Sequence, residues 1–319
     1  VDARWEASAK RRSLPWLTLR VGPDGKPVKK SSGWSSPFEA ADADGRAVVF
    51  KPTVKQDSRH PQFARKRTKV LADVVGSYVM EHMGVPTVRY FVGRAALDGH
   101  EVIGPYSYDV PITTLKQAKG ALAAQDSDVL VRGLVVDAWL GNVDRILNEG
   151  NVWLARTAFG GVKEGGIVFG DFDQAMKDGV SVLGVPKVPP AIFAAHATPE
   201  NVAAAVGAVT ALSDRDVRAM VAEALSGTHG LGQGYQEYFS RILIRNRDLL
   251  KTTDPFGPLL RGDLPRVRID RASAALLADA VYAQHGDFAT PRAEWVERML
   301  GEIMAKWSRS EEQTRLMRS

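Results

Sequence analysis

The sequence predicts an α+β protein of two lobes, with a β-rich N-terminal lobe over residues 1–110 and a mainly helical C-terminal lobe over residues 111–319. Two observations lead to this prediction. In the first 110 residues, short runs of β-forming residues alternate with turns that contain glycine and aspartate, and they enclose a single helical segment. From residue 199 onward, apolar residues recur instead with helical spacing in successive segments.

Composition defines the class of protein. With 319 residues, 45% of them apolar and 25% charged, the chain can bury a large core and has the make-up of a soluble globular protein. The absence of cysteine excludes disulfides, thiolate catalysis and cysteine-ligated metals, and the six histidines lack paired spacing. The sequence shows neither a membrane-spanning apolar run nor a signal peptide, so a cytoplasmic location is the simplest expectation.

The chain is basic, with a net charge of +5 and a pI near 9.3. Such a charge favours an anionic partner, which includes a nucleotide, a nucleic acid, an acidic protein or a membrane surface. A solvated basic surface without any partner explains the charge equally well.

The N-terminal lobe is predicted to contain strands at residues 16–21, 38–41 and 47–50, the last two joined by a hairpin turn at Asp44-Gly45. Lys51 directly follows three apolar β-formers at the end of the last strand. A lysine at the edge of a core can keep its aliphatic stem packed while its ammonium group meets a phosphate.

A helix is predicted around residues 70–79, whose apolar side chains recur at helical spacing, and Gly84-Val85-Pro86 should end it. Strands at residues 88–92 and 100–108 should follow. Two acidic residues lie on this helix. Asp73 is expected to point away from the apolar stripe, whereas Glu81 is expected nearer the edge of that stripe.

The stretch from residue 130 to residue 176 is the centre of the sequence. An apolar helix should end at Gly141, and a polar loop should follow it. Strands at residues 152–154 and 167–169, joined by a glycine-rich turn, would then return Asp171 to the mouth of that loop. The polar loop carries Asp144, Arg145, Asn148 and Asn151.

The predicted convergence of an acid, an amide and a second acid suits phosphoryl transfer. One carboxylate can orient an attacking hydroxyl, while an amide oxygen and a further carboxylate hold magnesium against phosphates. The sequence has no glycine-rich phosphate loop ending in Lys-Ser/Thr and no Gly-x-Ser-x-Gly motif before a helix. Nucleotide binding would therefore depend on a lysine together with magnesium.

Segments 137–145 (DAWLGNVDR), 170–173 (GDFD) and 50–52 (FKP), together with Asn151, resemble the HipA-like toxin kinases and the phosphatidylinositol-kinase-like branch of the protein-kinase-like superfamily. The resemblance implies a protein-kinase-like fold and an ATP- and magnesium-dependent kinase. Its preferred acceptor would be a protein Ser/Thr hydroxyl, because no lipid-anchoring amphipathic element stands out.

The resemblance also implies individual roles. Asp144 would be the catalytic acid/base, and Arg145 would neutralise phosphate charge or hold the loop. Lys51 would contact the α- and β-phosphates, with Asp73 or Glu81 as its acidic partner on the helix. The metal ligands would be Asp171, Asp173 and an asparagine, either Asn148 or Asn151, with Asn151 preferred because it directly precedes the strand.

Two departures from the family pattern leave other functions open. The usual asparagine five residues after Asp144 is replaced by Glu149, and the usual helix glutamate falls on Val74. A pseudokinase and a nucleotidyl transferase with the same fold are therefore alternatives, as is a basic nucleic-acid-binding protein.

The C-terminal lobe is predicted to end in a group of helices. Their expected ranges are 199–212, 214–225 with Ser213 as N-cap, 235–250, 271–284 and 291–307.

Overall fold

The structure is a computed structural model of the chain. It describes residues 13–30, 37–52, 54–55, 62–114, 127–142, 152–173, 175–176, 193, 195–232, 234–260, 293–294, 297–298 and 300. The chain divides into two compact units, residues 1–260 and residues 261–319. All of the strands β1–β9 and the helices α3–α9 belong to the first unit.

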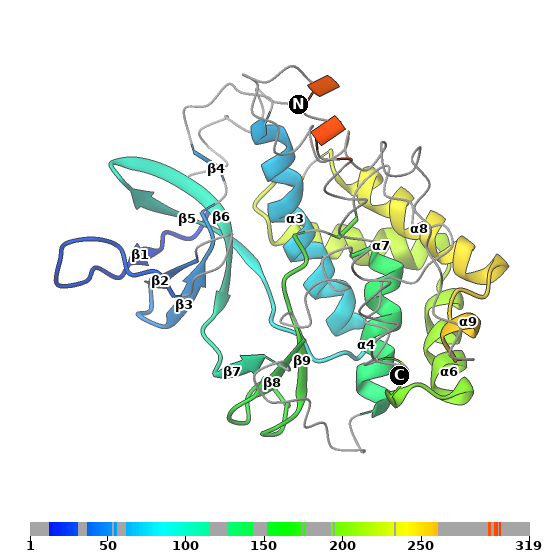
Figure 1. Cartoon of the computed structure of the whole chain (residues 1–319). Coiled ribbons are helices and arrows are strands. Elements are labelled where there is room, and N and C mark those ends of the chain that lie inside the picture. Colours follow the sequence, from blue (N-terminus) through cyan, green and yellow to red (C-terminus); the bar gives the residue numbers. More distant parts are fainter. Residues whose placement is uncertain are drawn as a thin grey trace. The chain divides into compact units, whose positions relative to one another are not determined.

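Within the described residues, a six-stranded antiparallel sheet forms the N-terminal part of this unit (Figure 1). Its strands are β1 (Thr18–Leu19), β2 (Phe38–Ala41), β3 (Ala47–Phe50), β4 (Val54–Lys55), β5 (Phe91–Leu97) and β6 (His100–Tyr108). The strand order is β1-β2-β3-β6-β4, and β5 also pairs with β6. The predicted β2–β3 hairpin is confirmed, with Phe38 opposite Phe50. Its turn contains Gly45 at φ +79°, a conformation that glycine adopts without strain.

Helix α3 (Gln62–His82) confirms the predicted helix and begins several residues before the segment whose spacing indicated it. It ends as predicted at Gly84, where φ is +69°. The strand predicted at residues 88–92 is wrong in its position, because β5 begins only at Phe91. The preceding segment bonds elsewhere: the Val88 N–H and the Thr87 hydroxyl each donate to the Phe169 carbonyl at 2.9 Å.

Helix α4 (Ser127–Leu140) and a three-stranded antiparallel sheet follow in the described chain, with the sheet made of β7 (Ile112–Thr114), β8 (Val152–Ala155) and β9 (Ile167–Phe169). The apolar helix ends at Gly141 as predicted, with φ +64°. The hairpin of β8 and β9 is also confirmed. Strand β7 was not among the predicted strands. It forms because its residues pair with β8.

The helices that follow are α6 (Pro199–Thr210), α7 (Asp214–Ser226), α8 (Gln236–Thr252) and the short α9 (Gly257–Leu260). The first three confirm the predicted helices within a few residues. Ser213 is the predicted N-cap of α7, and it forms a capping box with Asp216. The helix predicted at 271–284 and most of the helix predicted at 291–307 lie outside the described residues.

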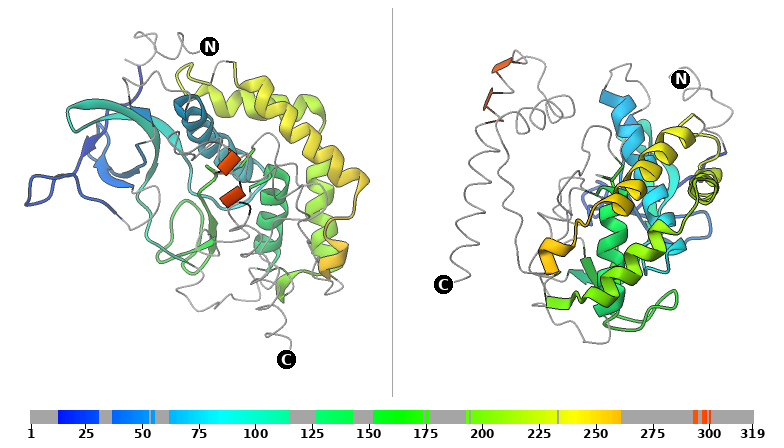
Figure 2. Two further views of the ribbon diagram at one scale, coloured as in Figure 1. Left: turned by 45° about the horizontal axis from the view of Figure 1, so that its top comes forward. Right: turned by 90° about the vertical axis from the view of Figure 1, so that its right-hand side faces the viewer.

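Helix α3 is enclosed on both sides. It contacts β4, β5 and β6 of the sheet as well as helices α4 and α7 (Figure 2). The main apolar cluster is formed by residues of α3, α4, the β8–β9 hairpin and the later helices, while a smaller cluster lies within the six-stranded sheet. The predicted α+β fold is confirmed, with its β-rich part first in the chain and its helices mainly afterwards. The expected division into lobes near residue 110 stays a prediction. Among the described helices, none combines the length and the apolar character needed to cross a lipid bilayer.

Candidate active site

Lys51 is positioned by the end of strand β3. Side chains alternate between the two faces of a strand, and Phe50 is fully buried in the sheet cluster, so Lys51 projects from the opposite face. The Lys51 N–H donates to the Pro105 carbonyl at 3.0 Å. A Cβ atom at Gly104 would lie 1.9 Å from the Lys51 carbonyl oxygen, so β6 requires a glycine at this close approach. The backbone that carries the lysine is therefore held firmly against β6.

Asp73 of α3 lies on the lysine side of the helix, which is the side away from the apolar stripe that the sequence predicts. Its side chain is 1% exposed, and its Oδ2 is 4.0 Å from the Lys51 Nζ. Its Oδ1 accepts a hydrogen bond of 2.8 Å from the Phe172 N–H. Asp73 is buried there because α3 is packed between the sheet and other helices and buries nearly its whole circumference.

Glu81, the other acidic residue considered as a lysine partner, lies away from Lys51. Its carboxylate pairs with Arg89 at 3.2 Å and is 65% exposed. Asp73 and Glu81 are eight positions apart, which is more than two turns of α3, so one side chain can reach Lys51 without the other. The structure thus brings Asp73, and not Glu81, to the lysine.

Asp171 is delivered by the β8–β9 hairpin. Gly170 precedes it, and a Cβ atom there would lie 2.0 Å from the Trp153 ring, so only glycine fits beneath that ring. Asp171 itself has φ +61°, a left-handed conformation that is unfavourable for a residue with a side chain, although aspartate tolerates it better than most. Backbone strain of this kind occurs most often at functional sites.

The side chains of Lys51 and Asp171 meet directly. Lys51 Nζ donates a hydrogen bond of 2.8 Å to Asp171 Oδ1, although the two residues are 120 positions apart. Tyr90 lies beside this pair: its ring centroid is 5.3 Å from Lys51 Nζ, and its hydroxyl accepts from the Asp171 N–H at 3.4 Å. A strand lysine, a helix carboxylate and an acid following β9 therefore share one site.

The end of α4 holds the backbone of Asp171. The Asn142 side-chain amide is buried and donates to the Asp171 carbonyl at 3.3 Å and to Asp137 Oδ1 at 3.1 Å. The Asn142 N–H also donates to the Asp137 carbonyl at 3.1 Å. These bonds link the last turn of α4, directly before the predicted catalytic loop, to the acid that faces the lysine.

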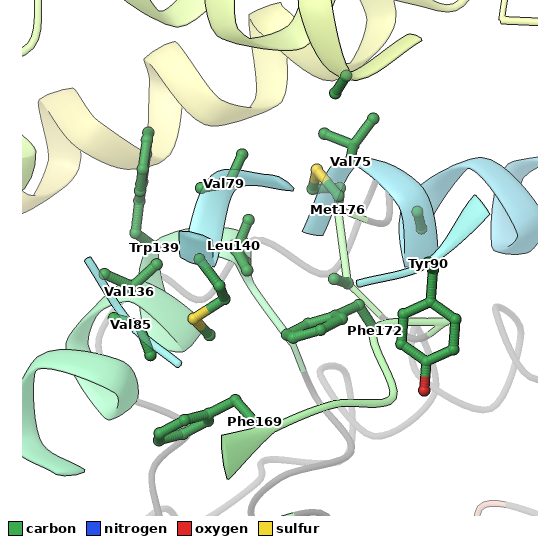
Figure 3. Close-up of a cluster of buried hydrophobic side chains, with 14 of the residues drawn as sticks. Val75, Val79, Val85, Tyr90, Val136, Trp139, Leu140, Phe169, Phe172 and Met176 are labelled. Atoms are coloured by element: carbon green, nitrogen blue, oxygen red, sulfur yellow. The ribbon is translucent and has the colours of Figure 1, made fainter. Parts of the chain in front are cut away.

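Phe172 anchors the same segment in the core. Its ring is fully buried and meets the Tyr90 ring edge to face at 6.5 Å between centroids. Figure 3 shows this ring among the side chains of Leu140, Met176 and Tyr90. A Cβ atom at Gly76 of α3 would lie 2.6 Å from Phe172, so the helix approaches the phenylalanine closely at that point. Packing and hydrogen bonds together therefore orient Asp171.

Asp173 completes the acidic segment from the outer side. Its Oδ2 is 3.6 Å from Lys69 Nζ, and both side chains are about one-quarter exposed, at 24% and 22%. Lys69 is on α3, one turn before Asp73. Among the described residues, the site thus combines the lysines 51 and 69 with the aspartates 73, 171 and 173.

Burial and charge shift the pKa values of the site in definite directions. Burial would lower the pKa of Lys51, but the neighbouring negative charges, with Asp171 first among them, outweigh it and hold this pKa well above its usual value. Burial raises the pKa of Asp73 to about 7, against the opposing attraction of Lys51. Burial also raises the pKa of Tyr90 above its usual value. Lys51 is therefore a permanent cation near neutral pH, whereas Asp73 is close to its titration point.

Several predicted site residues lie outside the described residues. They are Asp144, Arg145, Asn148 and Asn151. Among the residues that the structure does describe, no group of three or more Asp, Glu or His side chains could hold a metal ion on its own. Asp171 and Asp173 nevertheless offer the carboxylate oxygens that magnesium prefers, and Lys51 offers a cation for phosphate. The donor set at this site fits a magnesium-bound nucleotide.

Sequence reasoning missed three residues of the site: Lys69, Tyr90 and Asn142. Asn142 stands inside the segment that carried the family resemblance, so its place after the helix-ending glycine was a usable signal. Tyr90 and Lys69 gave no such signal, because nothing local distinguishes them from other residues of a strand-like segment and a basic helix.

No family model matches the sequence, and no curated protein matches it. Among solved structures, the chain is similar to the Helicobacter pylori proinflammatory kinase CtkA, with a TM-score of 0.47 and 12% identity over 75% of this chain and 98% of that one. It is also similar to the MAP kinase LmaMPK10 from Leishmania major, with a TM-score of 0.35 and 13% identity over 96% of this chain and 98% of that one. At this level of similarity, the side chains of the site say more about function than either neighbour does.

Proposed function

We propose that this protein is an ATP- and magnesium-dependent phosphotransferase of the protein-kinase-like type that transfers the γ-phosphate to a hydroxyl acceptor, with a protein Ser/Thr hydroxyl as the preferred one. The observation that carries the proposal is the 2.8 Å bond between Lys51 Nζ and Asp171 Oδ1, with the buried Asp73 carboxylate at 4.0 Å from the same ammonium group. Three separate elements, β3, α3 and the segment after β9, place these residues together.

A purely structural ion pair explains this arrangement less well. Taking charged groups out of water is costly, and well-packed apolar side chains of similar volume are often as stable or more stable. Here Lys51 is 14% exposed, Asp73 is 1% exposed, and Asp171 is held at positive φ. A site that combines buried charges, a perturbed carboxyl pKa and backbone strain is better explained by a ligand that uses them.

Each residue has a definite task in the proposed reaction. Lys51 binds the α- and β-phosphates, and Asp73 orients the lysine from the helix side. Asp171 and Asp173, with Asn151, would hold magnesium, which supplies positive charge against the phosphate oxygens. Asp144 aligns the acceptor hydroxyl and takes its proton, and Arg145 neutralises phosphate charge.

The test is phosphate transfer from labelled ATP by the full chain. The chain is incubated with magnesium and ATP labelled at the γ- or, separately, at the α-phosphate, with itself and a peptide library containing serine and threonine as acceptors. We expect γ label on protein and none from the α position. The variants Lys51→Met, Asp144→Ala and Asp171→Asn should each lower the rate at least about 100-fold, as expected when a charge that stabilises the transition state is removed.

Lys163→Met is the matched control, because Lys163 is an exposed lysine in the turn between β8 and β9. It should transfer phosphate at the wild-type rate. Label from the α position would replace the proposal with nucleotidyl transfer. ATP binding without any transfer would instead make the protein a pseudokinase.

A further inference from the structure

A second lysine, Lys69, lies at the outer edge of the candidate site. It is one helical turn before Asp73 on α3, and residues at this spacing occupy the same helix face. Asp73 is 4.0 Å from Lys51, and Lys51 bonds to Asp171. Helix α3 therefore directs Lys69 and Asp73 toward the segment after β9.

The partner of Lys69 does not hold it tightly. The distance from Lys69 Nζ to Asp173 Oδ2 is 3.6 Å, which is beyond hydrogen-bonding range. Both side chains are partly exposed, and a partly exposed ion pair of this kind contributes little to folding. Lys69 is therefore available to an anion that offers a better contact than Asp173 does.

The charges in the site also favour such an exchange. Lys51 already has two acidic neighbours, Asp171 and Asp73, whereas Lys69 faces Asp173 at the more exposed side. Asp173 is itself a predicted metal ligand, so its pairing with Lys69 need not persist when a ligand binds. A phosphate group carries more negative charge and more acceptor oxygens than a carboxylate, and it forms stronger bonds to an ammonium group.

We propose that Lys69 is a second phosphate-binding residue, which exchanges Asp173 for a phosphate oxygen of the bound nucleoside triphosphate. Lys51 and Lys69 then contact the phosphates from two elements, β3 and α3. The inference rests on the proposed nucleotide-dependent function and adds a residue that sequence motifs do not indicate.

The test is ATP binding to the full chain in the presence of magnesium, measured by isothermal titration calorimetry. Lys69→Ala should weaken binding about tenfold, the usual effect of removing one charge-assisted hydrogen bond, and Lys69→Arg should restore most of it. Lys251→Ala is the matched control, because Lys251 forms a similar ion pair of 3.7 Å with Asp248 on α8. That variant should bind ATP as the wild type does.

A second variant tests the exchange itself. In Asp173→Asn the competing carboxylate is removed, so ATP affinity without metal should rise by up to about fivefold, the factor that corresponds to a partly exposed ion pair. The inference is overturned if Lys69→Ala binds ATP as tightly as the wild type, if arginine does not restore a loss, or if Asp173→Asn binds metal-free ATP more weakly.

The two proposals fail in different ways. Wild-type protein that binds ATP but transfers no phosphate removes the proposed reaction and leaves the result for Lys69 standing. Wild-type protein that binds no ATP overturns both.

Discussion

The buried carboxylate of Asp73 makes the stability of the protein depend on pH in a way that one substitution should abolish. Asp73→Asn keeps an oxygen that can accept the Phe172 N–H bond, and it removes the only titrating group from the side chain. In the folded protein the pKa of Asp73 is raised to about 7 by burial, compared with 3.8 for an ordinary aspartate. Between these values the folded protein holds a proton that the unfolded chain has released.

The sign and size of the effect follow from this difference. The folded state binds more protons between pH 3.8 and about 7, so the free energy of unfolding falls as the pH rises through that range. Within the interval from pH 5 to pH 8, the loss of stability accumulates over the two pH units between pH 5 and the folded pKa of about 7. At 1.36 kcal/mol per unit, the wild type should lose roughly 3 kcal/mol through Asp73.

Urea denaturation of the wild type and of Asp73→Asn at intervals from pH 5 to pH 8 measures this loss. The variant should become more stable relative to the wild type by roughly 3 kcal/mol over the interval. Asp44→Asn, a substitution of an exposed aspartate that pairs with Arg46, should run parallel to the wild type and is the control. If the wild type instead becomes more stable relative to the variant as the pH rises, the reasoning is refuted, because attraction to Lys51 would then outweigh burial in setting the pKa of Asp73.

Three further substitutions, with Gly207→Ala as a comparison for the first, test packing and capping in the helices and around the site. Gly133→Ala should destabilise the protein by about 1–3 kcal/mol in urea denaturation, because its Cβ would lie 2.2 Å from the buried Phe169 ring. Gly207→Ala in α6 should instead stabilise it by up to about 1 kcal/mol, because a Cβ there would have nothing within 4 Å. If both glycines responded alike, close packing of α4 on β9 would be refuted. Phe172→Ala should cost about 3–5 kcal/mol and lower ATP affinity, and a loss below about 1 kcal/mol would show that the ring is not in the core. Ser213→Ala removes the capping box of α7 and should destabilise the protein by about 1 kcal/mol, which is measured as a lower midpoint of thermal unfolding. An unchanged midpoint would contradict the cap.

Much of the local structure could be predicted from the sequence because its causes are local. The hairpin of β2 and β3, the strand β6 and the hairpin of β8 and β9 follow from short runs of β-forming residues between turn-forming ones. The helix ends at Gly84 and Gly141 follow from the ease with which glycine adopts positive φ. The strand β5 was placed too early, because the segment before it pairs with the distant Phe169, and no local pattern records that pairing.

The candidate site likewise has features with local causes and features that depend on tertiary packing. A lysine directly after β3 and a glycine and an aspartate directly after β9 can be predicted from local sequence patterns. The approach of Asp73 rather than Glu81 to Lys51 depends on the packing of the layers, because the layers on both sides of α3 bury a face that an isolated helix would leave in water. The tertiary structure also decided the places of Lys69, Tyr90 and Asn142, since contacts between residues far apart in the chain depend on how the layers pack and not on the residues beside them.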